Sequence, residues 1–194
     1  MTLIDALRAS LAGPAPTHLL TGDLPDGAAG ELRNAAVLVA ITRRAELGVL
    51  LTVRREHLRT HAGQIAFPGG RIDAEDADAA AGALREAHEE IGLPPAQVEL
   101  WGTADRYRTV TGYSVVPVLG SVAPDLPLTA HEHEVAEWFE APLAFVLDPA
   151  NQRPVAAEFR GRMRQYYQID WNGRAIWGAT AAMLVNLTRR LGWS

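Results

Sequence analysis

The sequence predicts an α+β fold, in which a mixed β-sheet is sandwiched between helices. Segments typical of strands and of helices follow one another irregularly, without the β-α-β alternation of a parallel sheet. The chain has 194 residues, of which 48% are apolar and 21% charged, as in ordinary globular proteins. Because no internal repeat or domain boundary is evident, we expect one domain over residues 1–194. Within it, roughly residues 1–30 form an N-terminal helix and an extended surface segment.

The first third of the chain contains strand signals behind this N-terminal segment. Residues 1–10 have the pattern of a short amphipathic helix, and residues 12–30 are rich in Pro and Gly. Strands are expected over residues 33–44 and 47–56, joined by a hairpin. A short strand within GQIAFPGG (63–70) then ends in a turn that Pro68, Gly69 and Gly70 impose.

A helix is expected over residues 77–91. At 100° per residue its apolar positions form one stripe, made of Ala80, Leu84, Ala87 and Ile91. The acidic run at 73–78 supplies capping and charge that suits a helix N-terminus. Gly92 and the Pro94-Pro95 pair end the helix.

The second half of the chain returns to strands and closes with a helix. Strands are expected over residues 97–109, 112–122 and 134–141, followed by a short helix over 142–148. Residues 163–178 indicate a hairpin that turns at Asn172-Gly173, a strong two-residue turn signal. The last segment, 179–192, has the pattern of an amphipathic helix.

Composition excludes several classes of protein. The net charge of −5 argues against a nucleic-acid partner bound through phosphate neutralisation. The longest apolar run, residues 35–41, is too short to span a bilayer, so no membrane partner is expected. The chain has no cysteine, which excludes disulfides, thiolate metal sites and a thiol nucleophile. With no signal-peptide pattern at the start, we expect a cytoplasmic protein.

The segment REAHEEIGL (85–93) places three carboxylates, Glu86, Glu89 and Glu90, on one arc of the expected helix. Like charges at this spacing repel, so the arc is either a solvated surface or a site for a divalent cation. Mg²⁺ prefers a few carboxylates together with substrate phosphate, and a Gly-Gly turn lets backbone atoms approach an ion. Together with the turn, the three glutamates describe a metal-assisted phosphoryl-type site, although glutamates at this spacing alone are more often a solvated surface.

The same residues, with Arg85 before them and Ile-Gly-Leu after them, resemble the second half of the Nudix hydrolase signature, and the order of strands and helices suits the Nudix fold. The first half of the signature does not match this sequence. Its glycine and first glutamate would fall on Arg71 and Ala77, and Gly70 lies one residue before the expected glycine. Asp76 or Asp78 could take the place of that glutamate, whose role in the family is mainly structural.

A second motif narrows the resemblance. The stretch LLTVRREHLRTHAGQIAFPGG (50–70) resembles a pattern upstream of the signature in the coenzyme A pyrophosphatase branch. The positions in register are Leu50, Leu51, Thr52, Arg54, Arg59, Gly63, Phe67, Pro68, Gly69 and Gly70. Arg55 is the one mismatch, since the pattern has a small residue there.

The resemblance implies metal-dependent hydrolysis of coenzyme A at its pyrophosphate. Glu86 and Glu90 would be the primary ligands of Mg²⁺ or Mn²⁺, aided by the Gly70 carbonyl. Glu89 would be a further ligand or the base that activates water, and Arg85 would orient the glutamates. The rivals are a Nudix enzyme for another nucleoside diphosphate derivative, such as NADH or ADP-ribose, and a non-catalytic binding module.

Substrate contacts are expected from the 50–70 motif. All 18 basic residues are arginines, so any phosphate must be held by Arg. The candidates are Arg54, Arg59, Gly63, Phe67 and Gly69, although Phe67 is favoured more as a core residue than as a stacking platform. Arg55 either adds a phosphate contact or points to solvent.

The late segment HEHE (131–134) supplies one more candidate. The resemblance implies an extra carboxylate in a late loop, as a metal ligand or base, and Glu134 or the nearby Glu132 could provide it. Two histidines without a third do not favour zinc. His88, between the glutamates, is expected to be structural or exposed.

Overall fold

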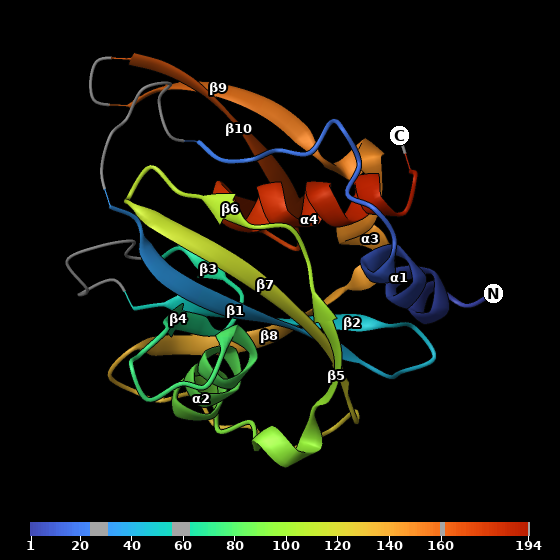
Figure 1. Cartoon of the computed structure of the whole chain (residues 1–194), viewed down its shortest axis with the longest axis vertical. Helices are drawn as coiled ribbons and strands as arrows, with labels where there is room; N and C mark the ends of the chain where they lie inside the picture. Colours follow the sequence, from blue (N-terminus) through green and yellow to red (C-terminus); the bar gives the residue numbers. More distant parts are fainter. Residues whose placement is uncertain (24–30, 56–62, 160–161, 194) are drawn as a thin grey trace.

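A mixed β-sheet forms the centre of the molecule in the computed structural model, which describes residues 1–23, 31–55, 63–159 and 162–193 (Figure 1). Its main path runs β3-β2-β1-β7-β5, while β4 adds to β1, β6 to β7 and β8 to β2. The strands are β1 (Arg33–Thr42), β2 (Gly48–Arg54), β3 (Ile65–Ala66), β4 (Gly69–Arg71), β5 (Glu99–Thr103), β6 (Tyr107–Arg108), β7 (Tyr113–Val122) and β8 (Val135–Pro142). β1 pairs with β7 in parallel along its whole length, and the other pairs are antiparallel.

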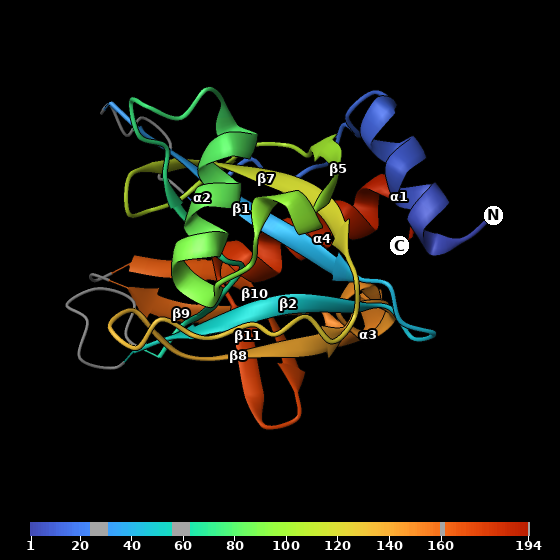
Figure 2. The same cartoon turned by 90° about the horizontal axis from the view of Figure 1, so that it is seen from below.

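Helices cover both faces of this sheet, as the sequence predicts. Successive side chains of β1 alternate between the faces. Leu38 packs in the apolar cluster that contains α2 (Ala79–Ile91), whereas Val39 packs in the cluster that contains α4 (Ala179–Arg190). The two views agree that α2 and α4 lie on opposite sides of β1 and β7 (Figures 1 and 2). The α+β sandwich follows from this alternation.

A second, three-stranded sheet lies on the α4 side. It consists of β9 (Arg153–Phe159), β10 (Arg162–Trp171) and β11 (Arg174–Trp177), in the order β11-β10-β9. The expected hairpin turns at Asn172 and Gly173, whose φ values of 48° and 72° are those of a two-residue hairpin turn. β9 was not predicted, because its sequence RPVAAEF contains proline and residues with little preference for strands.

The N-terminal segment is held against α4. α1 (Leu3–Ala12) begins with a capping box between Thr2 and Asp5 and buries Leu7 completely. Beyond α1, the Asn186 side chain accepts a hydrogen bond from the Leu20 N–H at 2.8 Å and donates one to its carbonyl at 2.9 Å. Arg189 donates to the His18 carbonyl at 2.6 Å. These contacts close a clasp, here meaning residues 18–20 bound to Asn186 and Arg189, between the two ends of the chain.

Two local expectations were wrong. Residues 69–71 form the strand β4 and not only a turn, because pairing with β1 holds them extended. The expected strand over 97–109 is divided into β5 and β6, after a bulge between Leu100 and Gly102. The remaining short helical elements are α3 (Leu143–Leu147) and two 3-10 turns, Pro95–Gln97 and Pro149–Asn151. No helix in the described part of the chain has the length and apolar character needed to cross a membrane.

Candidate functional site

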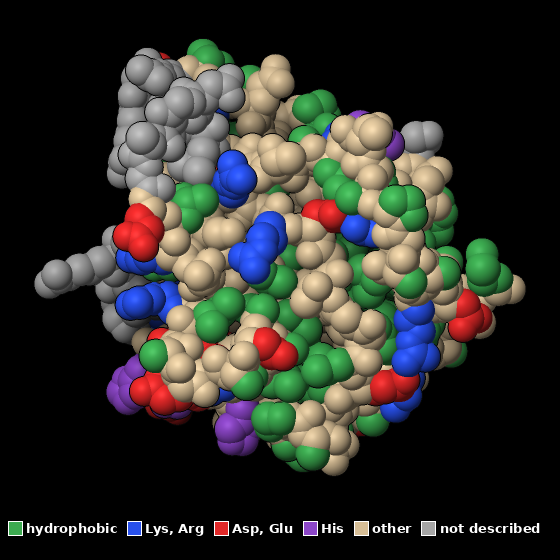
Figure 3. Space-filling view, in the orientation of Figure 1, with side chains coloured by type: hydrophobic (Ala, Val, Ile, Leu, Met, Phe, Trp, Pro, Cys, Tyr) green, Lys and Arg blue, Asp and Glu red, His purple; other side chains and the backbone are tan. Residues whose placement is uncertain are grey.

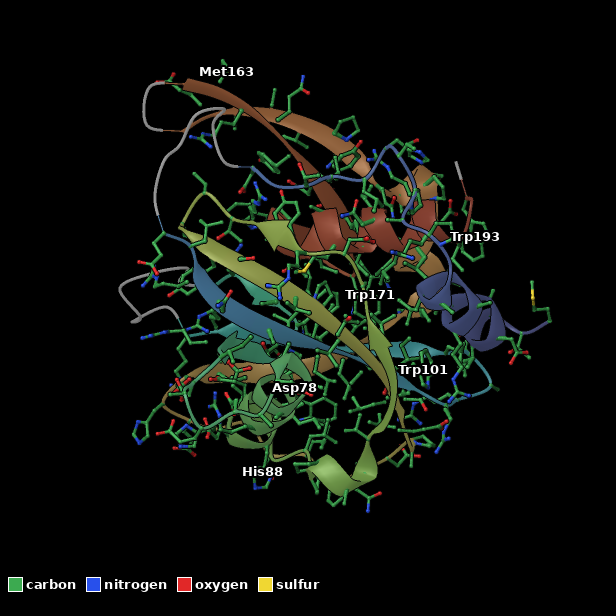
Figure 4. All side chains as sticks on the ribbon, viewed as in Figure 1. Asp78, His88, Trp101, Met163, Trp171 and Trp193 are labelled. Carbon is green, nitrogen blue, oxygen red and sulfur yellow. The ribbon has the colours of Figure 1, made fainter. Side chains whose placement is uncertain are left out.

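The helix that carries the glutamates has defined ends. Asp78 caps α2 by accepting a hydrogen bond from the Ala81 N–H at 2.8 Å (Figure 4). Gly92 ends it with a φ of 67°, in the left-handed region that glycine adopts without strain. Asp78 is therefore occupied with capping, whereas Asp76 accepts hydrogen bonds from Arg85.

The three glutamates differ in exposure, because the buried face of α2 is rotated from the predicted stripe. Ala83, Ala87 and Ile91 are fully buried, whereas Ala80 and Leu84 are only half-buried. The side chain of Glu90 is 4% exposed, that of Glu86 is 17% exposed and that of Glu89 is 57% exposed. Glu90 thus lies on the core side of the helix, and the expected arc of equivalent carboxylates becomes a gradient from core to solvent.

Two adjacent glycines of β4 lie under the buried glutamates. Gly69 pairs with Val37 of β1, and its N–H donates to Glu90 Oε2 at 3.1 Å. A Cβ atom added to Gly70 would lie 2.5 Å from Glu86 Cδ. The Glu86 carboxylate therefore occupies the space that a side chain at residue 70 would need.

Burial raises the pKa of Glu90 to about 7. The Gly69 N–H and the guanidinium of Arg54, whose Nη1 is 3.7 Å from Glu90 Oε1, oppose that rise. The negative charges of Glu86 and Glu134 add to it. A buried carboxylate with one N–H donor and one cation at 3.7 Å is only partly compensated, which suits a site where a further cation binds.

The pKa of Glu86 is also raised, again mainly by burial. The hydrogen bond from Arg85 lowers it, while Glu89 and Glu134 raise it through charge repulsion. Because Glu134 acts on both Glu86 and Glu90, its carboxylate belongs to the same group of charges. The sequence placed Glu134 44 residues away from Glu90, and the fold brings the two together.

Arg85 is the centre of a network that holds the glutamates. Its Nε and Nη2 donate to the two oxygens of Asp76 at 3.1 and 3.0 Å, in a bidentate pair. Nη1 donates to Glu86 at 2.9 Å and to Glu89 at 3.2 Å. Nη2 also donates to the Arg71 carbonyl at 2.9 Å. Arg85 therefore fixes the helix to the end of β4 and orients two of the three glutamates.

A loop over residues 129–134 lies against the C-terminal end of α2. The Thr129 and His131 N–H groups donate to the carbonyls of Ile91 and Glu90, at 3.0 and 2.8 Å. The Glu134 carbonyl accepts from the Arg55 N–H at 3.1 Å, which joins the loop to the end of β2. These backbone bonds position Glu134 beside the glutamates without using its side chain.

The donor set fits Mg²⁺ or Mn²⁺ in kind. Glu86 and Glu90 supply hard carboxylate oxygens beside a glycine backbone that carries no side chain. Among the described residues, no three acidic or histidine side chains come close enough to hold an ion by themselves. An ion at this site would therefore complete its shell with backbone, water or substrate oxygens, as Mg²⁺ commonly does.

Comparison with known proteins identifies the family. The NUDIX domain model matches residues 32–160. A relative from Escherichia coli K12, described as the uncharacterized Nudix hydrolase NudL, is 46% identical over 160 residues, which cover 82% of this chain and 83% of the relative. The chain belongs to the Nudix family.

A second relative agrees with the Nudix assignment, and a solved structure shares the fold. NudL from Shigella boydii is 45% identical, again covering 82% of this chain and 83% of the relative. A crystal structure of a MutT/nudix family protein from Enterococcus faecalis matches the fold with a TM-score of 0.50 and 16% identity, covering 99% of this chain and 70% of that one.

The remaining residues predicted for the Nudix site are placed less centrally. Phe67 is 2% exposed and packs in the core. Its ring is therefore not available to a substrate, and of the two roles considered for Phe67 the structure supports core packing. Gly63 lies in an exposed turn at a φ of 68°, where its N–H donates to the Arg54 carbonyl. Arg59 lies outside the described residues. His88 is exposed, as expected.

Sequence reasoning overlooked part of the Arg85 network. The Arg71 carbonyl and the Asp73 carboxylate, 3.5 Å from Nη2, both face Arg85, and neither was singled out. The acidic run at 73–78 was interpreted as helix capping, with Asp76 or Asp78 in the place of the signature's structural glutamate, and its contacts with Arg85 were not predicted. Its position, one loop before a helix with an arginine at its midpoint, was the signal that could have predicted the network.

The two glycines of β4 should respond differently to alanine. At Gly69 (φ 154°) a Cβ would meet backbone, with Val37 Cα at 2.6 Å, so Gly69→Ala should destabilise the protein by roughly 2 kcal/mol or more. At Gly70 the three nearest atoms all belong to the Glu86 carboxylate, at the end of a side chain, so Gly70→Ala should fold but lose about tenfold or more in kcat. Chemical denaturation and turnover separate the two effects, and equal stability losses in both variants would contradict this account.

Proposed function

We propose that this protein hydrolyses the pyrophosphate bond of coenzyme A, giving 4′-phosphopantetheine and adenosine 3′,5′-bisphosphate, with Mg²⁺ or Mn²⁺ as cofactor. Nudix membership and the relatives described as hydrolases support an enzyme of this general kind. The single observation that carries the proposal is the position of Arg54. The coenzyme A motif contributes this arginine, and its Nη1 is 3.7 Å from the buried Glu90.

The environment of Arg54 supports a role in holding an anion. Its side chain is 29% exposed, and its Nε atom is buried without a hydrogen-bond partner among the described residues. A buried donor without an acceptor costs free energy unless a ligand provides one. A substrate phosphate next to the glutamates would accept that hydrogen bond and offset the charge of the guanidinium.

The residues of the site would have different roles in hydrolysis. A bound divalent cation would neutralise charge on the pyrophosphate oxygens and activate water. Glu86 and Glu90 would hold it, while Arg85 keeps Glu86 and Glu89 in place by hydrogen bonds. Glu89 and Glu134 remain the two candidates for the base, because both are exposed and lie beside the buried pair. The base takes one proton from water as the oxygen attacks phosphorus and the bridging P–O bond breaks.

The test is a substrate panel of coenzyme A, NADH, ADP-ribose and dGTP, each with Mg²⁺, with Mn²⁺ and with EDTA, and with products separated by chromatography. Release of adenosine 3′,5′-bisphosphate from coenzyme A that stops with EDTA is the expected result. Preference for another substrate would contradict the specificity and leave the glutamate chemistry in place. If none of the four is turned over, the proposal fails and the non-catalytic binding module becomes the favoured alternative.

A further inference from the structure

A cavity of about 430 Å³ opens beside Glu89, between α2 and the loop over residues 129–134. Its lining includes His88 and Glu89 from the helix and Thr129, His131 and His133 from the loop. Figure 3 shows histidine side chains beside acidic ones at the lower left edge of the molecule, and in Figure 4 His88 projects from α2 away from the sheet. We refer to this cavity as the histidine pocket.

The histidine pocket and Arg54 lie at opposite edges of the glutamate cluster. On a helix, Glu89 is 100° away from Glu90, with Glu86 between them. Arg54 approaches the Glu90 edge, whereas the pocket begins at Glu89. A substrate whose pyrophosphate lies over Glu86 would therefore extend one substituent toward Arg54 and the other into the pocket.

The chemistry of the two edges differs. The described lining of the histidine pocket includes two carboxylates, Glu89 and Glu132, and no arginine, so a phosphate monoester would be repelled there. Histidine rings and the Thr129 hydroxyl offer both donors and acceptors to uncharged amides and hydroxyls. Among the described residues, no three of these side chains form a cluster suited to a metal ion. The cavity volume falls in the range that holds a small-molecule substituent.

We infer that the histidine pocket binds the uncharged, amide-containing arm of the substrate, while the more highly phosphorylated half lies toward Arg54. The inference deepens the proposed function, because coenzyme A has these two unlike halves: an arm with two amides and a hydroxyl, and a nucleoside with an additional phosphate. The pocket would thereby fix which way round the pyrophosphate lies over the glutamates.

The two products provide separate probes of the two edges. Binding of 4′-phosphopantetheine and of adenosine 3′,5′-bisphosphate is measured by calorimetry with Mg²⁺, on the wild type, the double variant His131→Ala/His133→Ala, and Arg54→Gln. The histidines are exposed, so the double variant should fold, which thermal melting checks. Loss of one or two hydrogen bonds predicts that its affinity for 4′-phosphopantetheine falls roughly five- to tenfold, with bisphosphate binding unchanged. Arg54→Gln should show the reverse pattern.

A second variant approaches the pocket differently. Ala130→Trp places a large side chain in the lining and should weaken 4′-phosphopantetheine binding without removing any histidine. The inference is overturned if 4′-phosphopantetheine does not bind the wild type, if the pocket variants leave its affinity unchanged, or if they weaken the bisphosphate instead. Turnover of coenzyme A by the wild type reports on the proposed function separately, so each idea can fail without the other.

Discussion

Glu86→Gln is expected to lower kcat by roughly 10²–10³-fold or more, because it removes a charge on which transition-state stabilisation through the metal depends. The fold should survive. The Glu86 carboxylate is half-buried, its pKa is raised by burial, and its partner Arg85 keeps Asp76 and Glu89 as acceptors. The neutral amide has nearly the same shape and can still accept the hydrogen bond from Arg85.

Steady-state kinetics with saturating Mg²⁺ test the predicted loss of kcat, and a denaturation curve tests whether the variant remains folded. Glu46→Gln is the matched control, because Glu46 is an exposed glutamate in the turn between β1 and β2, at the far end of β1 from Gly70. The control should retain wild-type kcat. Near-normal turnover in Glu86→Gln, or an equal loss in Glu46→Gln, would contradict the role assigned to Glu86.

The second large effect concerns Glu90 and the pH dependence of stability. Its pKa is about 7 in the folded protein, against an ordinary value of 4.5 for a glutamate. Between these values the folded state keeps a proton that the unfolded state loses, so the free energy of unfolding falls as pH rises from about 4.5 to 7. At 1.36 kcal/mol per pH unit the full loss is roughly 3 kcal/mol in metal-free protein.

Glu90→Gln should remove this loss. In EDTA the variant is expected to match the wild type in stability near pH 4.5 and to exceed it by roughly 3 kcal/mol above pH 7. With Mg²⁺ present, the variant should have lost its activity, whereas the wild type is active. Chemical denaturation at several pH values gives the difference. Added Mg²⁺ should raise wild-type stability at pH 8, because the cation pairs with the ionised carboxylate, and should affect the variant much less. A difference in the free energy of unfolding that does not change with pH would contradict this explanation.

The sequence predicted the elements whose signals are local. β1, β2 and β7 have long apolar runs, α2 has a cap and a terminal glycine, and the β10–β11 hairpin has its Asn-Gly turn. β4 escaped prediction, because Gly69-Gly70-Arg71 has no strand preference of its own and is extended only by its pairing with β1. The parallel pairing of β1 with β7, some 80 residues apart, also has no local signature.

The glutamate segment could be predicted as a site because three carboxylates and an arginine are close in sequence. Its electrostatics could not, since they depend on contacts between distant segments. Glu90 is buried because α2 packs on the sheet with a rotation that the apolar stripe alone did not define. Arg54 and Glu134 reach the glutamates from β2 and from the late loop, across 36 and 44 residues.

The clasp between the chain ends has a consequence for biosynthesis. A ribosome releases α1 first, yet Leu7 and residues 18–20 can dock fully only after Asn186 and Arg189 have been made. Until α4 has been made, the apolar side of α1 lacks its final partner, and such surfaces are where nascent chains aggregate or recruit chaperones. Folding of this domain therefore waits for contacts that span 166 and 171 residues of the chain, because α4 must be made before residues 18–20 can bind it.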